Sequence, residues 1–447
     1  MKRPGALFTD LYQLKMSQAY LAEGMGDDAV FSLFFRELPE RRNYLLTCGL
    51  GPVLEHLQEM EFTARDVDYL RGLGQFSDAF LDALSGIRFE CDVWAMPEGT
   101  PVFPEEPLVE VEGPIAQAQL AETVIMNQVN SSTILAAKAA RYVEAAAGRA
   151  VVDFGLRRIH GYDTGLKSAR AFHVAGLTAT SNVAAGRLYG VPVAGTMAHS
   201  YVQAHDDELA AFRRFVAEFP NTILLVDTYD TLDGVRKVIE LARELGDAFR
   251  VRGVRLDSGD LGELATRSRR LLDEAGLDDV EIFASGGLTD EKIRRLVRDG
   301  RPIDGFGVGT DLGVSADAPS LDMAYKLTGY AGRGRMKLST GKRTLPGRKQ
   351  VFRQEESGQT VRDLLARADE SLPGRPLLVQ VMEKGRILDA GREELDAMRD
   401  RARREIEALP ERVRSLDPAE PPFEVVLSDG MEEHLDKVRR RVSEESG

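Results

Sequence analysis

The sequence predicts a mixed α/β protein built around an irregular (β/α) barrel, with a smaller α/β domain beside it. The chain has 447 residues, more than one domain usually holds. From about residue 150 onward, short apolar runs alternate with amphipathic segments, which is typical of a parallel sheet with helical connections. Polar or glycine clusters follow six of these runs. A barrel uses many strand ends, whereas an open doubly wound sheet uses one switch point, so we favour an irregular or incomplete barrel.

The first 115 residues predict a small α/β domain. Apolar spacing over residues 10–23, with Thr9 and Asp10 as a cap, indicates a helix. Residues 30–35 predict a buried strand, and the alternation over 108–113 predicts another. Residues 116–147 contain no glycine or proline and indicate one or two helices, which we assign to the barrel domain at 116–318.

The barrel domain is predicted from an alternation of strands and helices. The expected strands are 150–152, 191–194, 223–226, 251–256, 280–283 and 303–308. The expected helices between them are 206–219, 232–245, 261–274 and 291–299, the last two capped by Asp260 and by Thr289-Asp290. After residue 320 the sequence predicts a helix at 396–409 that Pro410 ends, and ten frayed residues at the C-terminus.

Composition excludes several classes of function. The formal net charge of −14 argues against a nucleic-acid partner. No apolar run is long enough to span a membrane, and Met1-Lys2-Arg3 does not begin a signal peptide, so we expect a cytoplasmic protein. Cys48 and Cys91 form no CxxC pair and are expected to be buried, reduced thiols.

Two glycine-rich strand ends indicate a phosphate site. Ser285-Gly286-Gly287 precedes the helix start at Thr289, and Gly307-Val308-Gly309-Thr310 follows the last predicted strand. Such loops offer backbone N–H groups to phosphate at the mouth of a barrel. A glycine can also serve only to make a turn, but two such loops in tandem favour phosphate binding.

Charged residues gather at two neighbouring strand ends. Asp227, Asp230 and Asp257 could hold Mg²⁺, bind sugar hydroxyls or stabilise positive charge in a transition state, whereas Asp260 is expected to cap a helix. Arg255 lies two residues before Asp257 and therefore on the same face of the strand. A buried arginine needs an anionic partner, which makes Arg255 a candidate ligand for carboxylate or phosphate.

Two other strand ends carry candidate groups. His199 follows the predicted strand 191–194 and could act as base, metal ligand or nucleophile, since no local motif decides among these roles. Phe154 followed by Arg157 and Arg158 suits a flat anionic ligand through stacking and a bidentate carboxylate contact. The alternative is one core ring and two surface charges.

Five ordered motifs identify the chain as similar to a known family. They are Thr9-Asp10-Leu11-Tyr12-Gln13, Asp153-Phe154-Gly155-Leu156-Arg157-Arg158, Gly195-Thr196-Met197-Ala198-His199-Ser200, Leu256-Asp257-Ser258-Gly259-Asp260, and Lys337-Leu338-Ser339 with Thr344-Leu345-Pro346-Gly347. Together they closely resemble the nicotinate phosphoribosyltransferases. The resemblance runs from about residue 6 to 353, and little is recognisable beyond 360.

The resemblance implies an α/β fold with the irregular barrel of type II phosphoribosyltransferases, in which the segment 319–447 returns to the N-terminal domain 1–115. It also implies a homodimer with shared active sites. Family members join nicotinate to 5-phosphoribosyl 1-pyrophosphate (PRPP) and release nicotinate mononucleotide and pyrophosphate, an early step of NAD salvage. This reaction uses Mg²⁺ and is coupled to ATP hydrolysis through a phosphohistidine.

The resemblance also implies roles for individual residues. His199 would be phosphorylated and would act with Asp257 and Arg255 in catalysis. Nicotinate would contact Phe154, Arg157, Thr180, Ser181 and, from the other subunit, Tyr12. PRPP would contact Asp227, Ser258, Gly259, Ser285, Gly286, Gly287, Gly307, Gly309 and Thr310, to which charge and position add Lys337 and Lys342. Mg²⁺ would bind through the pyrophosphate, with Asp227 and Asp230 as candidate ligands.

The sequence differs from related family patterns at two points, and each difference leads to an expectation. Related nicotinamide enzymes have an aspartate where this chain has Ser181, and the absence of that carboxylate favours the acid as substrate. Some family members have a cysteine-bound zinc near the C-terminus, but no cysteine follows Cys91, so we expect no structural zinc.

Three alternatives are weighed against this interpretation. A quinolinate phosphoribosyltransferase would share the barrel but would need more cations and no ATP. A regulatory protein that has lost turnover would be free to lose Asp257, His199 and the glycine loops. An aldolase-like barrel would need a lysine at a strand end, and none ends a predicted strand.

Overall fold

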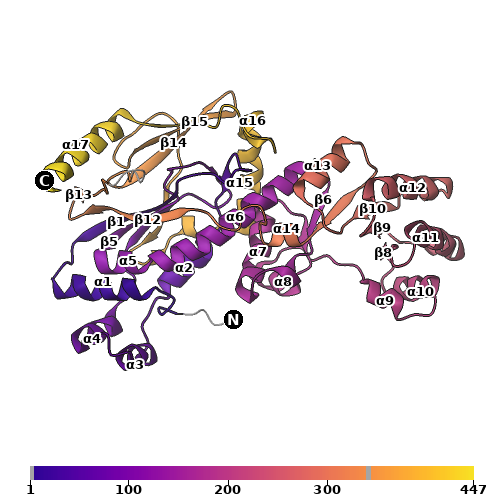
Figure 1. Ribbon diagram of the computed structural model, residues 1–447, viewed down its shortest axis with the longest axis horizontal. Coiled ribbons are helices and arrows are strands. Elements are labelled where there is room, and N and C mark those ends of the chain that lie inside the picture. The colour runs from indigo at the N-terminus through magenta and orange to yellow at the C-terminus, as the bar shows by residue number, and fades with distance from the viewer. Residues whose placement is uncertain (1–4, 339–343, 447) are drawn as a thin grey trace. The chain divides into compact units, whose positions relative to one another are not determined.

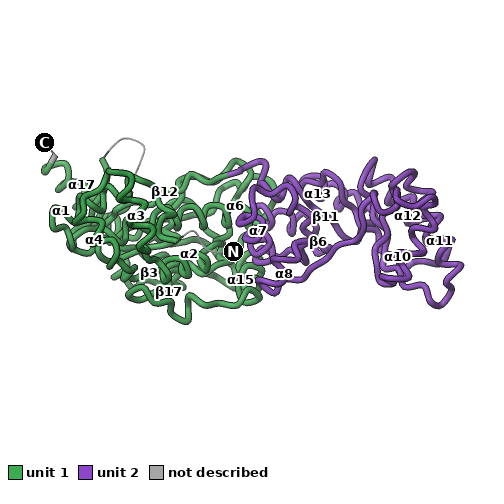
Figure 2. The backbone as a smooth tube through the Cα atoms, turned by 90° about the horizontal axis from the view of Figure 1, so that it is seen from below, with its two compact units in different colours: residues 1–137, 320–447 green, residues 138–319 purple. Residues whose placement is uncertain are grey.

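The two ends of the chain fold together. Residues 1–137 and 320–447 form one unit, called the terminal unit here, and residues 138–319 form the central unit (Figure 2). The computed structural model describes residues 5–338 and 344–446, so Lys342 lies outside the described residues.

The terminal unit is organised by a seven-stranded sheet that mixes strands from both chain ends (Figure 1). Its order is β13-β12-β1-β5-β3-β17-β18. The strands are β1 (Asp28–Phe35), β3 (Asp92–Ala95), β5 (Val109–Pro114), β12 (Met323–Tyr330), β13 (Arg333–Gly334), β17 (Val379–Glu383) and β18 (Arg386–Ile387). Leu33 of β1 pairs with Tyr325 of β12 on one side and with Val109 of β5 on the other. All three are buried, so the C-terminal segment completes the core of the N-terminal one.

Two smaller sheets complete the strands of this unit. The first has the order β16-β14-β15-β19 and the second pairs β2 with β4. Their bounds are β2 (Leu45–Leu46), β4 (Pro101–Val102), β14 (Lys349–Glu356), β15 (Gln359–Arg367), β16 (Arg375–Pro376) and β19 (Val425–Leu427). Arg353 of β14 is fully buried and lies 2.7 Å from Asp363 and 3.0 Å from Glu405, so its charge is balanced inside the protein.

The helices of the terminal unit are α1 (Leu11–Ala22), α2 (Leu50–Gln58), α3 (Ala64–Gly72), α4 (Asp78–Gly86), α5 (Ile115–Leu120), α15 (Leu395–Ala408), α16 (Glu411–Arg414) and α17 (Asp429–Ser446), with a 3₁₀ turn η3 at Asp389–Gly391. Helix α6 (Glu122–Ala146) runs on into the central unit. Asp10 caps α1, and α15 ends before Pro410, as predicted. Residues 438–446, most of the segment that was predicted to fray, continue helix α17, whose Met431, Leu435 and Val438 recur at helical spacing and are buried.

The central unit contains a parallel six-stranded sheet of order β7-β6-β11-β10-β9-β8 (Figure 1). The strands are β6 (Ala150–Asp153), β7 (Ala179–Thr180), β8 (Ile223–Leu225), β9 (Gly253–Leu256), β10 (Glu281–Ala284) and β11 (Gly305–Val308). The predicted mixed α/β fold with a parallel sheet is confirmed. Within residues 138–319, β7 and β8 are the outermost strands of the sheet and do not pair with each other. The sheet therefore forms a partial barrel and not a closed one.

Helices connect these strands. They are α7 (Tyr162–Val174), α8 (Val183–Tyr189), α9 (His199–Gln203), α10 (Glu208–Glu218), α11 (Thr231–Leu245), α12 (Leu261–Glu274), α13 (Asp290–Arg298) and α14 (Thr310–Gly313), with 3₁₀ turns η1 (Leu156–Arg158) and η2 (Gly246–Ala248). The predicted helix 261–274 matches α12 at both ends, and Asp260 caps it through the N–H of Glu263. The predicted strand 191–194 was wrong, since it contributes only an isolated bridge between Thr180 and Val193.

The sheet forms because its strands are buried on both faces. Val151, Leu224, Val254, Ile282 and Phe306 have almost no exposed surface. Helices α10, α11 and α12 are amphipathic and pack in sequence along the sheet (Figure 1). In the described part of the chain, no helix is both long and apolar enough to cross a membrane.

Candidate active site

The predicted site residues of the central unit lie along one edge of its sheet. All six strands are parallel, so their carboxyl ends meet at this edge. At or just after the strand ends, in the order of the sheet, lie Thr180, Phe154, Gly309, Ser285, Asp257 and Asp227. The candidate nicotinate residues are therefore at one end of the edge, the glycine loops in the middle, and the two aspartates at the other end.

Phe154 is held at the end of β6 by its neighbours. Its N–H donates to the carbonyl of Val308 at 2.6 Å, and its ring lies 6.2 Å from the ring of Phe283. A Cβ atom at Gly307 would come within 2.5 Å of the Phe154 ring. Gly307, predicted to contact phosphate, thus makes room for this ring, while Gly309 is half-buried and follows the end of β11.

Arg255 links the aromatic and acidic parts of the site. Its Nη1 donates to Thr196 Oγ1 at 2.6 Å, and its Nη2 lies 4.0 Å from Asp257 Oδ1. Its Cζ lies 5.8 Å from the centroid of the Phe154 ring. The side chain is only 12% exposed, as the face argument from the sequence required.

The electrostatics around Arg255 favour an anionic ligand. Burial lowers the pKa of Arg255, the carboxylates of Asp257 and Asp227 raise it, and the positive charge of Arg157 lowers it again. Arg157 itself is exposed on η1. Two cations that destabilise each other at the edge of a sheet are both stabilised by an anion placed beside them.

Asp257 is fixed by the first glycine loop and by Asp227. Ser285 donates its hydroxyl to Asp257 Oδ1, and the Asp257 N–H donates to Asp227 Oδ2 at 3.0 Å. Gly286 has a φ of 89°, and a Cβ there would lie 1.7 Å from the carbonyl oxygen of Asp257. The close approach of the two loops therefore requires glycine at 286, and Ser285 acts on Asp257 from a buried position.

Asp227 has one free oxygen. Its Oδ2 accepts from the Asp257 N–H and from the Ser258 hydroxyl, so Ser258 is engaged within the protein. Its Oδ1 is buried and has no hydrogen-bond partner in the described residues. Asp230 Oδ1 accepts from the Asp233 N–H and caps α11, and the second oxygen of this carboxylate takes no part in the cap.

His199 lies between the two aspartate-bearing strands. It is the first residue of α9, and its Nδ1 is 3.2 Å from the hydroxyl of Thr228, which follows β8. Its Nε2 is 3.9 Å from Asp257 Oδ2, and the side chain is 39% exposed. The imidazole is thus oriented by Thr228 and lies beside a carboxylate while it stays accessible to a substrate.

The remaining loop residues present backbone groups. Gly286 and Gly287, with φ of 89° and 58°, are exposed, and Thr310 is the exposed first residue of α14. Gly259 has a φ of 78° in the turn between Asp257 and α12. These positions leave N–H groups near the strand ends, as phosphate binding needs.

Two predicted residues belong to the terminal unit. Tyr12 is on α1 of the terminal unit, where 48% of it is exposed and burial together with the Glu122 carboxylate raises its pKa to about 12. Lys337 is exposed in the same unit, beyond β13. Lys342 falls outside the described residues.

Comparison with known proteins assigns the family. Residues 7–130 match the N-terminal domain of nicotinate phosphoribosyltransferase, and residues 149–345 match the nicotinate phosphoribosyltransferase family. The chain belongs to the nicotinate phosphoribosyltransferase family. It is an enzyme of that activity, which decides against the regulatory protein and the aldolase-like barrel.

Individual relatives agree with this assignment. The chain is 54% identical over 435 residues to a nicotinate phosphoribosyltransferase of Mycobacterium tuberculosis, covering 97% of this chain and 94% of the relative. It is 40% identical over 377 residues to that of Bacillus subtilis, covering 82% and 77%. The crystal structure of human nicotinic acid phosphoribosyltransferase is 29% identical, with a TM-score of 0.86 over 96% of this chain and 99% of that one.

A protein with a different name has a similar fold. The crystal structure of nicotinate-nucleotide pyrophosphorylase from Pyrococcus furiosus is 26% identical and matches with a TM-score of 0.73, covering 90% of this chain and 95% of that one. The similarity of fold alone therefore does not select the nicotinate phosphoribosyltransferase activity, whereas the family match does.

Asp153 stands in one of the quoted motifs of this member of the nicotinate phosphoribosyltransferase family, but the sequence analysis assigned it no role of its own. Its Oδ1 accepts from the Gly155 N–H at 2.7 Å and its Oδ2 from the Thr180 hydroxyl at 2.7 Å. Its backbone carbonyl accepts from the N–H of Ser181. Burial raises its pKa. Asp153 thus joins the Phe154 loop to Thr180 and Ser181, and the signal for it was an acid at a strand end.

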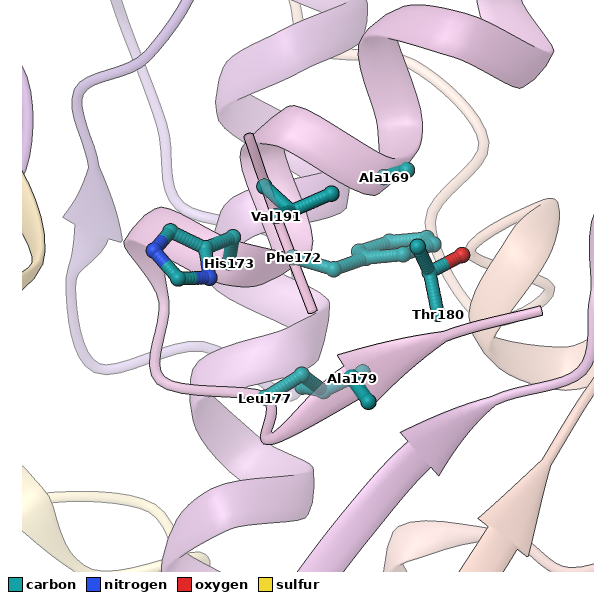
Figure 3. A pocket seen from close by; sticks show the side chains of 7 residues that line it. All are labelled: Ala169, Phe172, His173, Leu177, Ala179, Thr180 and Val191. Atoms are coloured by element: carbon teal, nitrogen blue, oxygen red, sulfur yellow. The ribbon is translucent and has the colours of Figure 1, made fainter. Parts of the chain in front are cut away.

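A small pocket lies behind Thr180 (Figure 3). Its lining residues are Ala169, Phe172, His173, Leu177, Ala179, Thr180 and Val191, from α7, β7 and their flanking loops. The cavity is about 10 Å³, no more than one water molecule needs. A pyridine ring does not fit there, so this pocket is not the nicotinate site.

Proposed function

We propose that the enzyme joins nicotinate to PRPP and couples this reaction to ATP hydrolysis through a phosphorylated His199. The pyridine nitrogen forms a bond to C1 of the ribose as the bond from C1 to the pyrophosphate oxygen breaks. Separately, the γ-phosphoryl group of ATP moves to a ring nitrogen of His199, ADP leaves, and water later releases phosphate. The observation that carries the proposal is the position of His199 beside Asp257 and Thr228.

Asp257 would stabilise the reacting sugar. The transfer passes through a state in which C1 and the ring oxygen carry positive charge, so a fixed negative charge nearby lowers its energy. Asp257 is fixed by the Ser285 hydroxyl and by Asp227. A carboxylate that needs no reorganisation during the reaction is the most effective kind.

Nicotinate would bind at the other end of the same edge. The ring would stack on Phe154, and its carboxylate would lie between Arg255 and Arg157, whose mutual repulsion it would relieve. Thr180 and Ser181 would line this part of the site, held by Asp153. Ser181 leaves the region without a carboxylate that would repel the substrate.

PRPP would occupy the middle of the edge. The backbone N–H groups of Gly286, Gly287, Gly309 and Thr310 would bind its 5-phosphate, and Gly259 would leave room for its ribose. Lys337 and Lys342 are proposed as additional phosphate contacts.

Mg²⁺ would neutralise the leaving pyrophosphate when bound. No cluster of three histidine, cysteine, aspartate or glutamate side chains suited to a metal occurs in residues 5–338 and 344–446. The buried, unpaired Oδ1 of Asp227 is the protein oxygen that would face it. Asp230 would be the second candidate ligand through its other carboxylate oxygen, since its Oδ1 caps α11.

We also propose a cytoplasmic homodimer in which Tyr12 of a second copy of the chain covers the nicotinate ring. The Tyr12 ring is 48% exposed on α1, as a residue that contacts another molecule must be. Shared sites of this kind need a symmetric assembly.

Product formation tests the proposal. Purified protein is given PRPP and Mg²⁺ with nicotinate, nicotinamide or quinolinate, each with and without ATP, and the His199→Ala variant is assayed in parallel. Mononucleotide from nicotinate, stimulated by ATP in the wild type and not in the variant, supports the proposal. Stimulation that survives in the variant contradicts the role of His199, and carbon dioxide release from quinolinate contradicts the choice of substrate.

A further inference from the structure

A buried lysine outside the described site contacts three carboxylates. Lys138 lies in α6, and 1% of its side chain is exposed. Its Nζ is 3.3 Å from Asp290 Oδ1, 2.9 Å from Asp311 Oδ2 and 3.1 Å from Asp317 Oδ1. All four residues belong to the central unit, and the proposed reaction uses none of them.

These carboxylates belong to the segments that follow the two glycine loops. Asp290 is the first residue of α13, three positions after Gly287. Asp311 directly follows Thr310 in α14. A single ammonium group therefore bridges the continuations of both proposed phosphate loops.

The next turn of α6 makes the same connection. Arg141 Nε contacts Asp290 Oδ2 at 2.7 Å. The hydroxyl of Tyr142 donates to Asp311 Oδ2 at 2.6 Å and lies 3.1 Å from the carbonyl oxygen of Leu288, next to Gly287. Both loops are thus tied to one rigid helix at more than one point.

The positive charge of Lys138 balances the carboxylates around it. Asp290 and Lys138 are fully buried, where charges interact through a low effective dielectric and an unpaired carboxylate is costly. Without Lys138, the three carboxylates would lose the cation that they share. Their repulsion would push the starts of α13 and α14 apart, and with them the glycine loops.

We propose that Lys138 is a positioning residue that holds the two glycine loops at the spacing needed to bind the 5-phosphate of PRPP. The inference rests on the proposed function, because that function assigns the phosphate to these loops. Lys138 does not touch the substrate. Its effect should appear in the binding of PRPP and not in that of nicotinate.

The test is the neutral variant Lys138→Met, which keeps the length of the side chain. We expect the KM for PRPP to rise by about tenfold or more and the KM for nicotinate to change by less than about twofold. The matched control is Lys349→Met, which removes another buried lysine, paired with Glu110 at 2.9 Å in the terminal unit. The control should lose stability and leave the KM for PRPP unchanged.

A milder variant keeps the test decisive if Lys138→Met does not fold. Tyr142→Phe removes only the hydroxyl that joins Leu288 and Asp311, and we expect the KM for PRPP to rise by roughly two- to fivefold. Equal changes in both KM values, or a Tyr142→Phe variant with the KM values of the wild type, overturn the inference.

Calorimetric binding of PRPP with Mg²⁺ to the wild type and the variants separates this inference from the proposed function. If the wild type binds PRPP but forms no mononucleotide, the proposed function fails while the role of Lys138 is still measured. Binding to Lys138→Met that is as tight as to the wild type overturns the role of Lys138 alone.

Discussion

Close contacts with neighbouring groups, more than a direct chemical role, explain why several positions in this site need their particular residue type. Gly307 gives space to the Phe154 ring, Gly286 gives space to the carbonyl of Asp257, and Asp153 joins two loops. The sequence assigned Gly286 and Gly307 to the site for their backbone N–H groups and gave Asp153 no role of its own. The packing roles of Gly307 and Asp153 depend on neighbours that are distant in the sequence, which is why one sequence did not reveal them.

The first prediction at this scale concerns Gly286→Ala. The new Cβ would lie 1.7 Å from the carbonyl oxygen of Asp257 and would force the loop away from the carboxylate that we propose to be catalytic. We expect kcat/KM to fall on the order of 100-fold or more, since a displacement of about 1 Å has that effect. Steady-state assays at a temperature below unfolding measure it.

Gly276→Ala is the matched control for this variant. Gly276 has a φ of 72° in the same unit, with nothing within 4 Å of an added Cβ. It carries the left-handed strain, about 1–2 kcal/mol, without the clash. An equal loss of activity in both variants would mean that backbone strain, and not the contact with Asp257, accounts for the effect.

The second prediction concerns Glu106, a fully buried acid in the terminal unit. Burial first, and then the negative charge of Asp363, raise the pKa of Glu106, while Arg353 opposes the shift. The folded protein therefore holds a proton that the unfolded chain releases. Stability from this group is complete below the unfolded pKa, near 4.3, and is lost as pH rises through the folded value.

Glu106→Gln removes this loss because the amide does not ionise. We expect the variant to melt higher than the wild type at pH 8, by roughly 2–4 °C, and to match it at about pH 4. Thermal unfolding at both values of pH measures the difference, with Glu37→Gln at an exposed position as control. A gain that is the same at both values of pH would contradict the assigned cause.

At the scale of elements, the sequence predicted helices with strong local signals correctly, but it did not predict the short strands. The helix 261–274 was predicted to the residue because its apolar spacing and the Asp260 cap are both local. Strand β7 has two residues and gives no periodic signal. Residues 191–194 read as a strand, but Pro192 has no N–H to donate and only Val193 forms a bridge.

The loop after β7 carries the prediction at this scale, through Ser181→Asp. The Ser181 N–H donates to the carbonyl of Asp153, so the loop is fixed beside the proposed nicotinate site. A new carboxylate there would repel that of nicotinate, and we expect the KM for nicotinate to rise on the order of tenfold. Kinetics with nicotinate and nicotinamide measure the change in preference.

Ser181→Asn, with the same size and no charge, is the comparison for this variant. If the KM for nicotinate rises equally in the asparagine and aspartate variants, the size of the side chain at this position and not its charge determines the effect. The KM for PRPP should stay constant in both, because the glycine loops follow other strands.

At the scale of the whole molecule, the strand pairing of the terminal unit cannot be predicted from the hydrophobic periodicity of one sequence. Its strand β1 pairs with β12, which lies almost 300 residues later in the chain. Pairing over that distance depends on which faces fit, and no local motif records it. Resemblance to a family, in contrast, pointed to an association of both chain ends, and the structure places β12, β13, β17 and β18 in one sheet with β1.

The proposed assembly makes a prediction that only the whole molecule can satisfy. If each site combines Phe154 of one chain with Tyr12 of another, Tyr12→Ala and Phe154→Ala homodimers each contain only defective sites. A mixed dimer of the two variants contains one site with both changes and one site with neither. Co-expression that gives half mixed dimers should therefore restore about a quarter of the wild-type activity. The mixed dimer isolated with two different affinity tags should have about half of the wild-type activity, because one of its two sites is intact. No recovery from a mixed dimer of normal stability would place both rings in the same chain's site, and the exposed α1 face would then need another role.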